Sequence, residues 1–341
     1  MVKVSILITG IGGGGFGEQI LKALYLSKKY ELNLIGTDII EDSAGKQLCD
    51  IFKRVPPVYN ENYSVEINAL IKKYNIRYIF PGSEPELFYF SNNRESFIER
   101  NIHLAINSQE IIDICSNKYL TYKKIEALGI KLPNYLKIDS IDDLSKMDYF
   151  PVVLKPNTSS GGSSNVFIAT DADEVQLLGS YMLRRGVDLI AQEYFGSSNQ
   201  EYTIGVSSDI NGKVLGSVII KRDISNALSI RQKVKNANNT YVISSGLSQG
   251  KVVKDESIQK KAELIAEKLN SKGPINIQCR YVNNELYIFE INPRLSGTTN
   301  IRALAGYNEP EMMIGLNLFD DKWLFDIKEI VVMRSLKEVV I

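Results

Sequence analysis

The sequence is short of the residues that many enzymes use for acid–base and metal chemistry. It contains one histidine, His103, and three cysteines, Cys49, Cys115 and Cys279. The histidine lies in the apolar run 102–106, which favours a structural role, and this argues against His-based triads and His-rich metal sites. The cysteines lack metal-ligand spacing and do not suggest a disulfide framework. The chemistry must therefore come from other side chains.

The sequence also lacks an excess of charge and a long hydrophobic run. Forty basic residues balance forty acidic residues, so no overall field favours nucleic acid as a partner. Without a signal peptide or a long apolar span, we expect a cytoplasmic protein with no membrane partner. With 341 residues, 44% of them hydrophobic, the chain is long enough for two or three domains with buried cores.

The first forty residues follow the pattern of a mononucleotide-binding βαβ unit. An apolar segment, residues 2–9, precedes a glycine-rich turn at 10–17 and an expected helix at about 18–29. A second expected strand, 32–37, ends at Asp38. The turn satisfies the G-x-G-x-x-G fingerprint in two registers, so the match is not specific. A nicotinamide dehydrogenase is the obvious interpretation of this segment alone, but nothing downstream supplies a base for hydride transfer.

An acidic segment follows a later strand of the same pattern. Residues 81–86 come directly after an expected strand at 78–80, and open α/β sheets bind ligands at the carboxyl ends of their strands. Glu84 and Glu86 are therefore candidates for substrate contact. The alternative is a helix, expected at about 86–99, that begins with acidic first-turn residues.

A lysine followed by glycines and serines forms the next candidate site. Lys155 comes directly after an expected strand at 152–154, and a loop rich in Gly and Ser occupies 156–164 before another strand at 166–169. Backbone N–H groups of such a loop can bind phosphates. The segment is not a P-loop, which would place Gly-Lys-Ser/Thr at the start of a helix. A flexible hairpin tip is the structural alternative.

Residues 274–299 read as two β-strands that meet at Asn283 and Asn284. Strand alternation places Glu290 and Asn292 on one face of the second strand. It places Tyr287, Phe289 and Ile291 on the other face, and it groups Gln278 with Asn276 and Arg280 on the first strand. One carboxylate and two amides supply only oxygen ligands, which suits Mg²⁺ rather than zinc. A polar edge hairpin is the alternative.

The register of this hairpin decides whether the metal site exists. A two-residue turn would leave Gln278 and Glu290 on opposite faces, whereas a three-residue connection at 283–285 pairs them. We expect the three-residue connection or an equivalent bulge. Arg294 then follows the second strand and is placed to meet phosphates bound by such a metal.

Taken together, these features resemble the ATP-grasp superfamily, and its carbamoyl-phosphate-synthase-like branch in particular. The resemblance covers nearly the whole chain. The motifs that carry it are Lys118, Lys155 with its Gly/Ser loop, Gln192-Glu193-Tyr194, Glu201, Gln278 and Glu290-Ile291-Asn292-Pro293-Arg294. It implies an α/β fold with a Rossmann-like preATP-grasp domain at 1–115. A two-subdomain ATP-grasp fold of α+β character with an antiparallel sheet then follows. Its small subdomain at 116–188 carries the Gly/Ser loop, and its large subdomain at 189–341 carries the Mg-ATP site and C-terminal strands.

The resemblance also implies a role for each matching residue. The expected phosphate contacts are Lys118 and Lys155, covered by the loop residues Ser159, Ser160, Gly161, Gly162 and Ser163. The expected nucleotide contacts beyond the phosphates are Gln192, the adenine connector Glu193, Tyr194 and Phe195, and Glu201 at the ribose hydroxyls. The expected ligands of one or two Mg²⁺ ions, for which Mn²⁺ can substitute, are Gln278, Glu290 and Asn292. The expected catalytic cations are Arg294 at the transferring phosphoryl group, Lys155, and Lys221 and Arg222 at phosphate or an acceptor carboxylate. The expected substrate-side residues are Ser296, Gly297 and Thr298.

The implied activity is ATP-dependent ligation of a small-molecule carboxylate to an amine. ATP phosphorylates the carboxylate, an amine attacks the acyl phosphate, and ADP and phosphate are released. A bicarbonate-activating enzyme like carbamoyl-phosphate synthase and an ATP-binding subunit without turnover are the alternatives. The chain is far shorter than a full carbamoyl-phosphate synthase, has no second ATP site and lacks a biotin-carboxylase histidine signature. The sequence leaves open whether the protein forms a homodimer.

Overall fold

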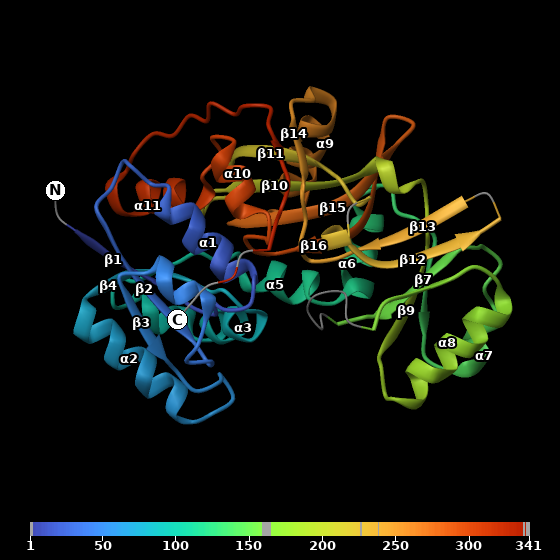
Figure 1. The fold of residues 1–341 in the computed structure, drawn as a ribbon, viewed down its shortest axis with the longest axis horizontal. Helices are drawn as coiled ribbons and strands as arrows, with labels where there is room; N and C mark the ends of the chain where they lie inside the picture. The colour runs from blue at the N-terminus through green and yellow to red at the C-terminus, as the bar shows by residue number, and fades with distance from the viewer. Residues whose placement is uncertain (1–2, 159–164, 226, 238, 337, 339–341) are drawn as a thin grey trace.

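The computed structural model describes residues 3–158, 165–225, 227–237, 239–336 and 338. The strands of this part of the chain form sheets of five, four and six strands and a separate two-stranded hairpin. Figure 1 shows the five-stranded and four-stranded sheets at opposite ends of the molecule, with the six-stranded sheet between them. In the same described residues, no helix is long and apolar enough to cross a membrane.

The first sheet is parallel, with strand order β3-β2-β1-β4-β5. Its strands are β1 (Val4–Ile8), β2 (Leu32–Asp38), β3 (Ile51–Arg54), β4 (Ile76–Phe80) and β5 (His103–Leu104). The surrounding helices are α1 (Phe16–Tyr25), η1 (Ala44–Leu48), α2 (Asn62–Tyr74), α3 (Glu84–Asn92), α4 (Arg94–Ile98) and α5 (Gln109–Cys115). Because successive strand residues face opposite sides, Leu7 packs with α2 and α3, while Ile6 and Ile8 pack with α1. This confirms the Rossmann-like arrangement.

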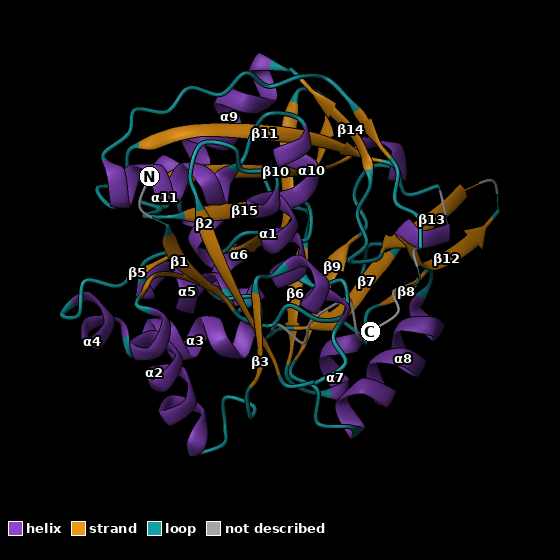
Figure 2. Ribbon diagram, turned by 60° about the vertical axis from the view of Figure 1, so that its left-hand side comes forward, coloured by secondary structure: helices purple, strands orange, loops and turns teal. Residues whose placement is uncertain are grey.

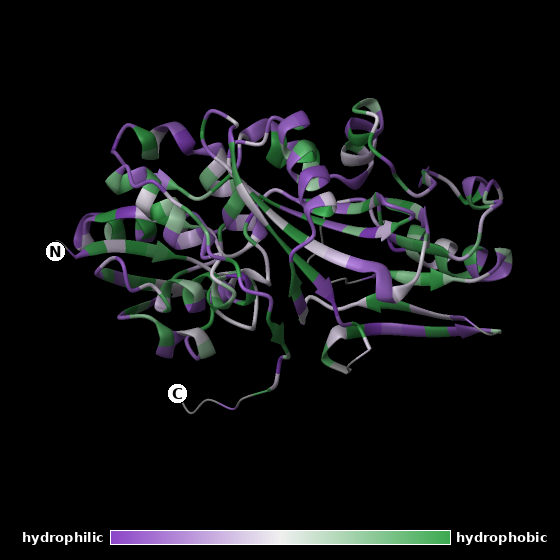
Figure 3. Ribbon diagram, turned by 90° about the horizontal axis from the view of Figure 1, so that it is seen from above, coloured by the Kyte–Doolittle hydropathy of each residue, from purple (hydrophilic) through white to green (hydrophobic). Residues whose placement is uncertain are grey.

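Figures 2 and 3 show how this sheet is covered. Helices α2, α3 and α4 lie on its outer side in Figure 2, and hydrophobic residues follow the strands near the N-terminus in Figure 3. Two details differ from the sequence prediction. The helix expected at 86–99 is interrupted at Asn93, whose φ of −107° and ψ of 16° are not helical. The helix expected to continue to residue 29 ends at Tyr25, whose side chain is 68% exposed.

The four-stranded sheet has the order β6-β9-β7-β8 and is antiparallel. Its elements are β6 (Tyr135–Ile138), α7 (Ile141–Leu144), β7 (Val152–Pro156), β8 (Phe167–Ala169), α8 (Ala172–Arg184) and β9 (Leu189–Glu193). Helix α6 (Lys118–Ala127) precedes it, and Gly129 beyond the helix has a φ of 70°, as expected for a glycine C-cap. Apolar residues of α8, such as Val175 and Met182, cover one face.

The six-stranded sheet is antiparallel, with the order β16-β15-β10-β11-β14-β17. Its strands are β10 (Glu201–Ser208), β11 (Val214–Arg222), β14 (Gly250–Val253), β15 (Pro274–Val282), β16 (Glu285–Asn292) and β17 (Val331–Val332). Helix α9 (Glu256–Lys268) packs Ala262 and Ile265 against Ile204 and Ile277 on one face. The other face carries polar residues. The hairpin β12 (Ile230–Asn236) and β13 (Asn239–Ser244) stands beside the sheet, and the 3-10 helices η2 (Ser198–Gln200) and η3 (Ala227–Ser229) lie in loops.

The C-terminal part of the chain returns to the first sheet. Helix α10 (Thr299–Leu304) follows the hairpin, and α11 (Glu309–Phe319) packs Met312 into the same cluster as Ile20 of α1. Beyond α11, the strands expected between 323 and 341 are reduced, within the described residues, to the two-residue β17. The sheets lie within residues 4–104, 135–193 and 201–332, and domain boundaries at 115 and 188 stay a prediction.

Candidate functional site

The β15–β16 hairpin brings the predicted metal ligands together. Val282 pairs with Glu285, so the turn has two residues and not the three that we expected. The register then shifts between Gln278 and Cys279, so that Gln278 pairs with Glu290. Phe289 is the extra residue of this bulge. The metal site requires that Gln278 pair with Glu290. This pairing is formed by a bulge, which we expected as the alternative to a three-residue connection.

The bulge also changes which side chains face the pocket. Strict alternation predicted Tyr287 and Phe289 on the face opposite Glu290, but both line the pocket together with Glu290 and Asn292. One inserted residue reverses the alternation on its N-terminal side. The carbonyl oxygen of Phe289 accepts hydrogen bonds from the Tyr122 hydroxyl at 2.7 Å and from Lys155 Nζ at 3.2 Å. The bulge thus also holds the pocket lysine.

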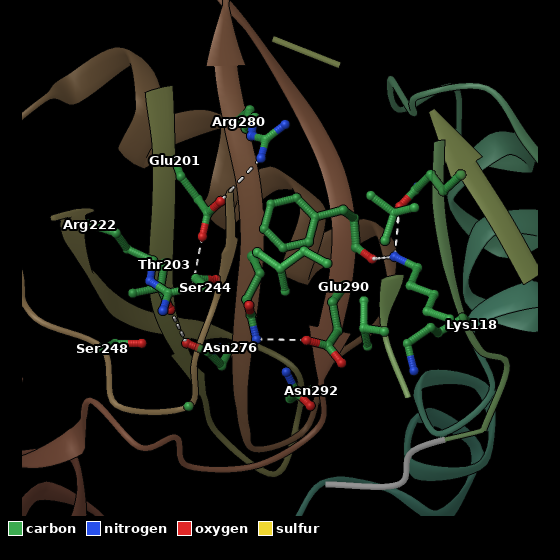
Figure 4. Close-up of a pocket in the computed structure, with 18 of the residues that line it drawn as sticks. Lys118, Glu201, Thr203, Arg222, Ser244, Ser248, Asn276, Arg280, Glu290 and Asn292 are labelled. Atoms are coloured by element: carbon green, nitrogen blue, oxygen red, sulfur yellow. Dashed lines mark hydrogen bonds and ion pairs between the residues drawn. The ribbon is translucent and has the colours of Figure 1, made fainter. Parts of the chain in front are cut away.

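One pocket brings together most of the predicted site residues. It is lined by the polar face of the six-stranded sheet, by β7 and β9 of the four-stranded sheet, and by loops (Figure 4). The predicted residues that line it are Glu84, Lys118, Lys155, Gln192, Glu193, Tyr194, Phe195, Glu201, Arg222, Gln278, Glu290, Asn292, Arg294, Ser296, Gly297 and Thr298. The predicted loop residues Ser159, Ser160, Gly161, Gly162 and Ser163 lie outside the residues that the structure describes.

Two candidates do not line this pocket. Lys221 is exposed, because alternation along β11 directs it to the side opposite the buried Arg222. Its predicted contact with phosphate or an acceptor carboxylate stays a prediction. Glu86 is buried inside the first sheet's helical layer, where it accepts hydrogen bonds from Tyr63 at 3.0 Å and Ser83 at 2.6 Å. Burial raises the pKa of Glu86. It serves the packing of α3 and not the pocket.

Lys155 is a buried cation of the pocket whose pKa is lowered. Its side chain is buried, and its ammonium group donates to Gln192 Oε1 at 2.8 Å as well as to the Phe289 carbonyl. Burial, with the charge of nearby Lys118 as the next cause, lowers the pKa of Lys155 to about 7. Two lysines that line one pocket create a site where phosphate oxygens would be stabilising.

The predicted adenine connector lies at one end of the pocket. Phe195 stacks on Tyr287, with ring centroids 4.0 Å apart. The Tyr194 ring lies 3.8 Å from the Arg280 guanidinium carbon, and its hydroxyl group is bonded to the backbone of Val242. The Glu193 carboxylate accepts a bond from Asn134 Nδ2 at 2.7 Å. Aromatic faces and fixed backbone groups suit a flat heterocyclic ring.

Glu201 is held between two arginines, as Figure 4 shows. Its Oε1 accepts from Arg222 Nη1 at 2.8 Å, and its Oε2 accepts from Arg280 Nη2 at 3.4 Å. The glutamate and both arginines are buried, and desolvation lowers the pKa of Arg222. Each carboxylate oxygen can accept a second bond, so the ribose contact predicted for Glu201 is compatible with these pairs and stays a prediction.

The donor set around Glu290 fits a hard cation that also binds phosphate oxygens and water. The described residues contain no group of three or more His, Cys, Asp or Glu side chains able to hold a metal. Glu290, Gln278 and Asn292 offer one carboxylate and two amides, the oxygen donors that Mg²⁺ accepts. Gln278 Nε2 donates to Glu290 Oε2 at 2.7 Å. In this arrangement Gln278 orients the carboxylate, and it must turn its amide oxygen inward to ligate.

Sequence reasoning missed several side chains that shape the pocket. Tyr122 on α6 is fully buried, and its hydroxyl group donates to the Phe289 carbonyl at 2.7 Å and lies 3.1 Å from Gln192 Oε1. Thr203 on β10 donates to Asn276 Oδ1 at 2.8 Å. No local motif marks these two residues, because their roles arise from strands distant in sequence. Arg280 could have been predicted as a pocket residue, because strand alternation already placed it on the same face as Gln278.

Among the described residues, the glycine-rich turn meets the pocket's cations only through Phe16, whose ring lies 4.2 Å from the Arg294 guanidinium carbon. Asp38 Oδ2 accepts a hydrogen bond from the Gly12 N–H at 2.7 Å, and its Oδ1 accepts from the Ile40 N–H at 3.0 Å. A Cβ atom added at Gly12 would lie 2.8 Å from Asp38 Oδ2. Asp38, the acidic residue that would contact a dinucleotide ribose, is therefore already hydrogen-bonded to the backbone of Gly12 and Ile40. His103 stacks on Tyr78 with ring centroids 5.7 Å apart, in line with a structural role.

Comparisons with known proteins agree with this geometry. A family model described as an ATP-grasp domain matches residues 115–298, and one described as a PylC-like N-terminal domain matches residues 6–105. The carbamoyl phosphate synthase large chain of Saccharolobus solfataricus is 25% identical over 79% of this chain and 24% of its own length. An uncharacterized protein of Methanocaldococcus jannaschii is 27% identical over 81% of this chain and 63% of its own length. The chain thus spans about a quarter of the first relative and under two thirds of the second.

Solved structures share the fold at low sequence identity. The biotin carboxylase domain of Hydrogenobacter thermophilus 2-oxoglutarate carboxylase, solved with MgADP, ADP and bicarbonate, has a TM-score of 0.65 at 14% identity, covering 95% of this chain and 72% of that chain. The D-alanine–D-alanine ligase of Bacillus anthracis has a TM-score of 0.59 at 16% identity, covering 93% and 98%. The L-amino acid ligase of Bacillus licheniformis has a TM-score of 0.64 at 15% identity, covering 94% and 74%. On the match that spans residues 115–298, more than half of its length, this chain belongs to the ATP-grasp family.

Proposed function

We propose that this protein is an ATP-dependent carboxylate–amine ligase that works through an acyl phosphate. The observation that carries the proposal is a single pocket in which Lys118, Lys155 and Arg294 surround the same space as Glu290. Phosphoryl transfer needs positioning and positive charge more than covalent help from the protein. A chain with one histidine can therefore perform it.

The pocket residues divide between binding the nucleotide and guiding the transfer. Lys118 and Lys155 hold the outer phosphates of ATP, while Tyr194 and Phe195 enclose the adenine. Glu290 and Asn292 hold Mg²⁺, which when bound neutralises charge on the phosphates; Mn²⁺ fits the same oxygen donors. Arg294, which lines the same pocket beside Glu84, stabilises the phosphoryl group and the attacking carboxylate. The Gly/Ser loop that includes Ser159 to Ser163 covers the phosphates and excludes water.

The reaction balances without any further reactant. A carboxylate oxygen attacks the γ-phosphorus, the bond from that phosphorus to the bridging oxygen breaks, and ADP leaves. An amine nitrogen then attacks the acyl carbon, the acyl–oxygen bond breaks, and phosphate leaves with the carboxylate oxygen. The amine gives up its proton to solvent or to the leaving phosphate. Cations at the outer phosphates favour this cleavage over attack at the α-phosphorus, which would release AMP.

The structurally similar proteins include ligases, which supports ligation as the proposed reaction. Two of the similar structures are a D-alanine–D-alanine ligase and an L-amino acid ligase, and a third is a dimer in complex with bicarbonate and MgADP. We infer small-molecule substrates and a homodimer for this chain by analogy. The test is a screen of carboxylic acids, bicarbonate included, against a panel of amines, with ADP and phosphate release as the readout. ADP release that requires both an organic acid and an amine supports the proposal, and release with bicarbonate alone contradicts it.

A further inference from the structure

The pocket end formed after Asn292 holds a carboxylate and a guanidinium side by side. Glu84, the first residue of α3, pairs with Arg294, and its Oε1 lies 3.2 Å from Arg294 Nη2. The two side chains are only 22% and 16% exposed, and both line the pocket. Glu84 follows the carboxyl edge of the first sheet, and Arg294 lies in the segment after β16. The ion pair therefore connects these two parts of the chain at the pocket.

Arg294 does not depend on Glu84 for its position. Its guanidinium carbon lies 4.2 Å from the centre of the Phe16 ring, Nη1 donates to the Leu295 carbonyl at 3.2 Å, and Nη2 also donates to Asn292 Oδ1 at 3.3 Å. The buried Nε has no hydrogen-bond partner among the described residues. Arg294 therefore keeps a free donor, and Glu84 is not needed to orient it.

The place of Glu84 is unfavourable for a site that takes only anions. A carboxylate at the end of a pocket for phosphates and an acid substrate repels both, unless the substrate brings a cation with it. Acidic residues are common in the first turn of a helix, but Glu86 and the Ser83 cap already serve the start of α3. Residues with small side chains, Ser296, Gly297 and Gly246, line the same end and leave room for a substrate.

We propose that the acid activated by this enzyme is an α-amino acid, whose ammonium group binds Glu84 while its carboxylate binds Arg294. The inference rests on the proposed ligase function and specifies its substrate class. One carbon separates the ammonium and carboxylate groups of an α-amino acid. A single molecule can therefore replace the contact between Glu84 and Arg294 with two charge-assisted hydrogen bonds. Glu84 then selects the acid, and a carboxylic acid without the ammonium group leaves its charge unpaired.

In the test, hydroxylamine serves as the nucleophile, so that the natural amine substrate does not need to be known. Hydroxamate and ADP are measured for pairs of acids that differ only in the α-amino group, such as L- or D-alanine against propionate, and longer pairs of the same kind. We expect kcat/KM for the preferred amino acid to exceed that of its desamino partner by roughly a hundredfold or more. Equal or better use of the desamino acids overturns the inference.

The variant Glu84→Gln separates contact with substrate from a merely structural role. It should lower kcat/KM for the amino acid by roughly a hundredfold and change the desamino rate and the KM for ATP by no more than about threefold. Equal losses with both acids would show that Glu84 only positions Arg294, and would overturn the inference. The control is Glu99→Gln, which removes the same charge from an exposed site outside the pocket and should leave both rates unchanged.

Failure of the proposed function would show a different pattern. If no acid in the panel causes ADP release, the ligase proposal is contradicted, and binding decides the inference. Calorimetry with a non-hydrolysable ATP analogue and Mg²⁺ then compares each amino acid with its desamino partner. Tighter binding of the amino acid, lost in Glu84→Gln, supports the ammonium site. Equal binding of the two, or no binding of either, overturns it.

Discussion

The glycine-rich turn after β1 and the β15–β16 hairpin are the two places where the sequence suggests a nucleotide, and they differ in where their charges point. At the turn, the two oxygens of Asp38 accept bonds from backbone N–H groups, one from Gly12 of the turn and one from Ile40, two residues after Asp38. At the hairpin, Glu290 faces a pocket that also contains Lys155 and Arg294. A nucleotide site is therefore indicated by charges that face a cavity, and glycines alone show only that the backbone turns tightly.

The two regions also differ in how their polar groups are supported. Asp38 accepts the hydrogen bond of the Gly12 N–H group from within the same βαβ unit. The hairpin instead uses a bulge, whose carbonyl at Phe289 fixes Lys155 and Tyr122 from the four-stranded sheet and α6. The pocket is thus built by contacts between segments distant in sequence, so its disruption should affect catalysis, whereas disruption of the turn should affect stability.

The largest effect is expected for Glu290→Ala. Loss of the only carboxylate in the predicted metal set should lower kcat by about a thousandfold, because charge on the phosphates is no longer neutralised. The fold should survive, since the side chain lies at the pocket and outside the apolar cluster. Steady-state ADP release and thermal unfolding measure the two properties. Full activity with Mg²⁺ would contradict the metal assignment.

A smaller loss is expected for Lys155→Met, which keeps the buried aliphatic stem and removes the charge. Phosphoryl transfer should slow by roughly a hundredfold, the usual size for one preorganised donor to a transition-state anion. Lys251→Met is the control, because Lys251 lies on β14 with an exposed side chain outside the pocket. Equal rates for the two variants would remove Lys155 from the phosphate site.

The lowered pKa of Lys155 predicts a proton linkage to ATP binding. With a pKa of about 7 in the free protein, the lysine is mostly neutral at pH 8, and phosphate anions raise its pKa by stabilising the charged form. Binding at pH 8 should therefore take up close to one proton, and affinity should fall up to about tenfold per pH unit above 7. Calorimetry in buffers of different ionisation enthalpy measures the uptake. An unchanged uptake in Lys155→Met would assign it to another group.

The same pKa has a consequence for folding. The unfolded lysine titrates near 10.4, so between pH 7 and that value the unfolded chain binds more protons than the folded chain. The contribution of Lys155 to stability therefore rises with pH across this window. Lys155→Met should remove this slope from the pH dependence of the free energy of unfolding, measured by urea titration.

The smallest effect on activity is expected at the glycine turn. Asp38→Ala leaves the Gly12 and Ile40 N–H groups without their acceptor, which should cost about 1–3 kcal/mol in the free energy of unfolding. The KM for ATP should stay within about twofold of the wild-type value, and NAD should not bind in either form. Loss of ATP affinity in a variant that remains folded would reverse the ranking of the two regions.

The sequence predicted more of the site residues than of the side chains and helices that surround them. Motif spacing and strand alternation suffice to identify Lys155, Glu290 and Arg294 as pocket residues, because each belongs to a local sequence motif. They fail for Tyr287, since one bulged residue reverses the alternation. They also do not show that Arg222 lines the pocket and Lys221 does not, because adjacent residues of a strand face opposite sides and only the fold shows which side is the pocket. Helix α11 escaped prediction because it is buried between α1 and the C-terminal segment and shows no amphipathic stripe.

The most direct measurement follows the carboxylate oxygen. An acid accepted by the enzyme is labelled with ¹⁸O in its carboxylate, converted in the presence of ATP and amine, and the released phosphate is examined by mass spectrometry. Attack on the γ-phosphorus transfers one carboxylate oxygen to phosphate, so each phosphate should carry one labelled oxygen and ADP should be released in equal amount. Label found in AMP, with pyrophosphate as the other product, or phosphate without label, would contradict the acyl-phosphate mechanism.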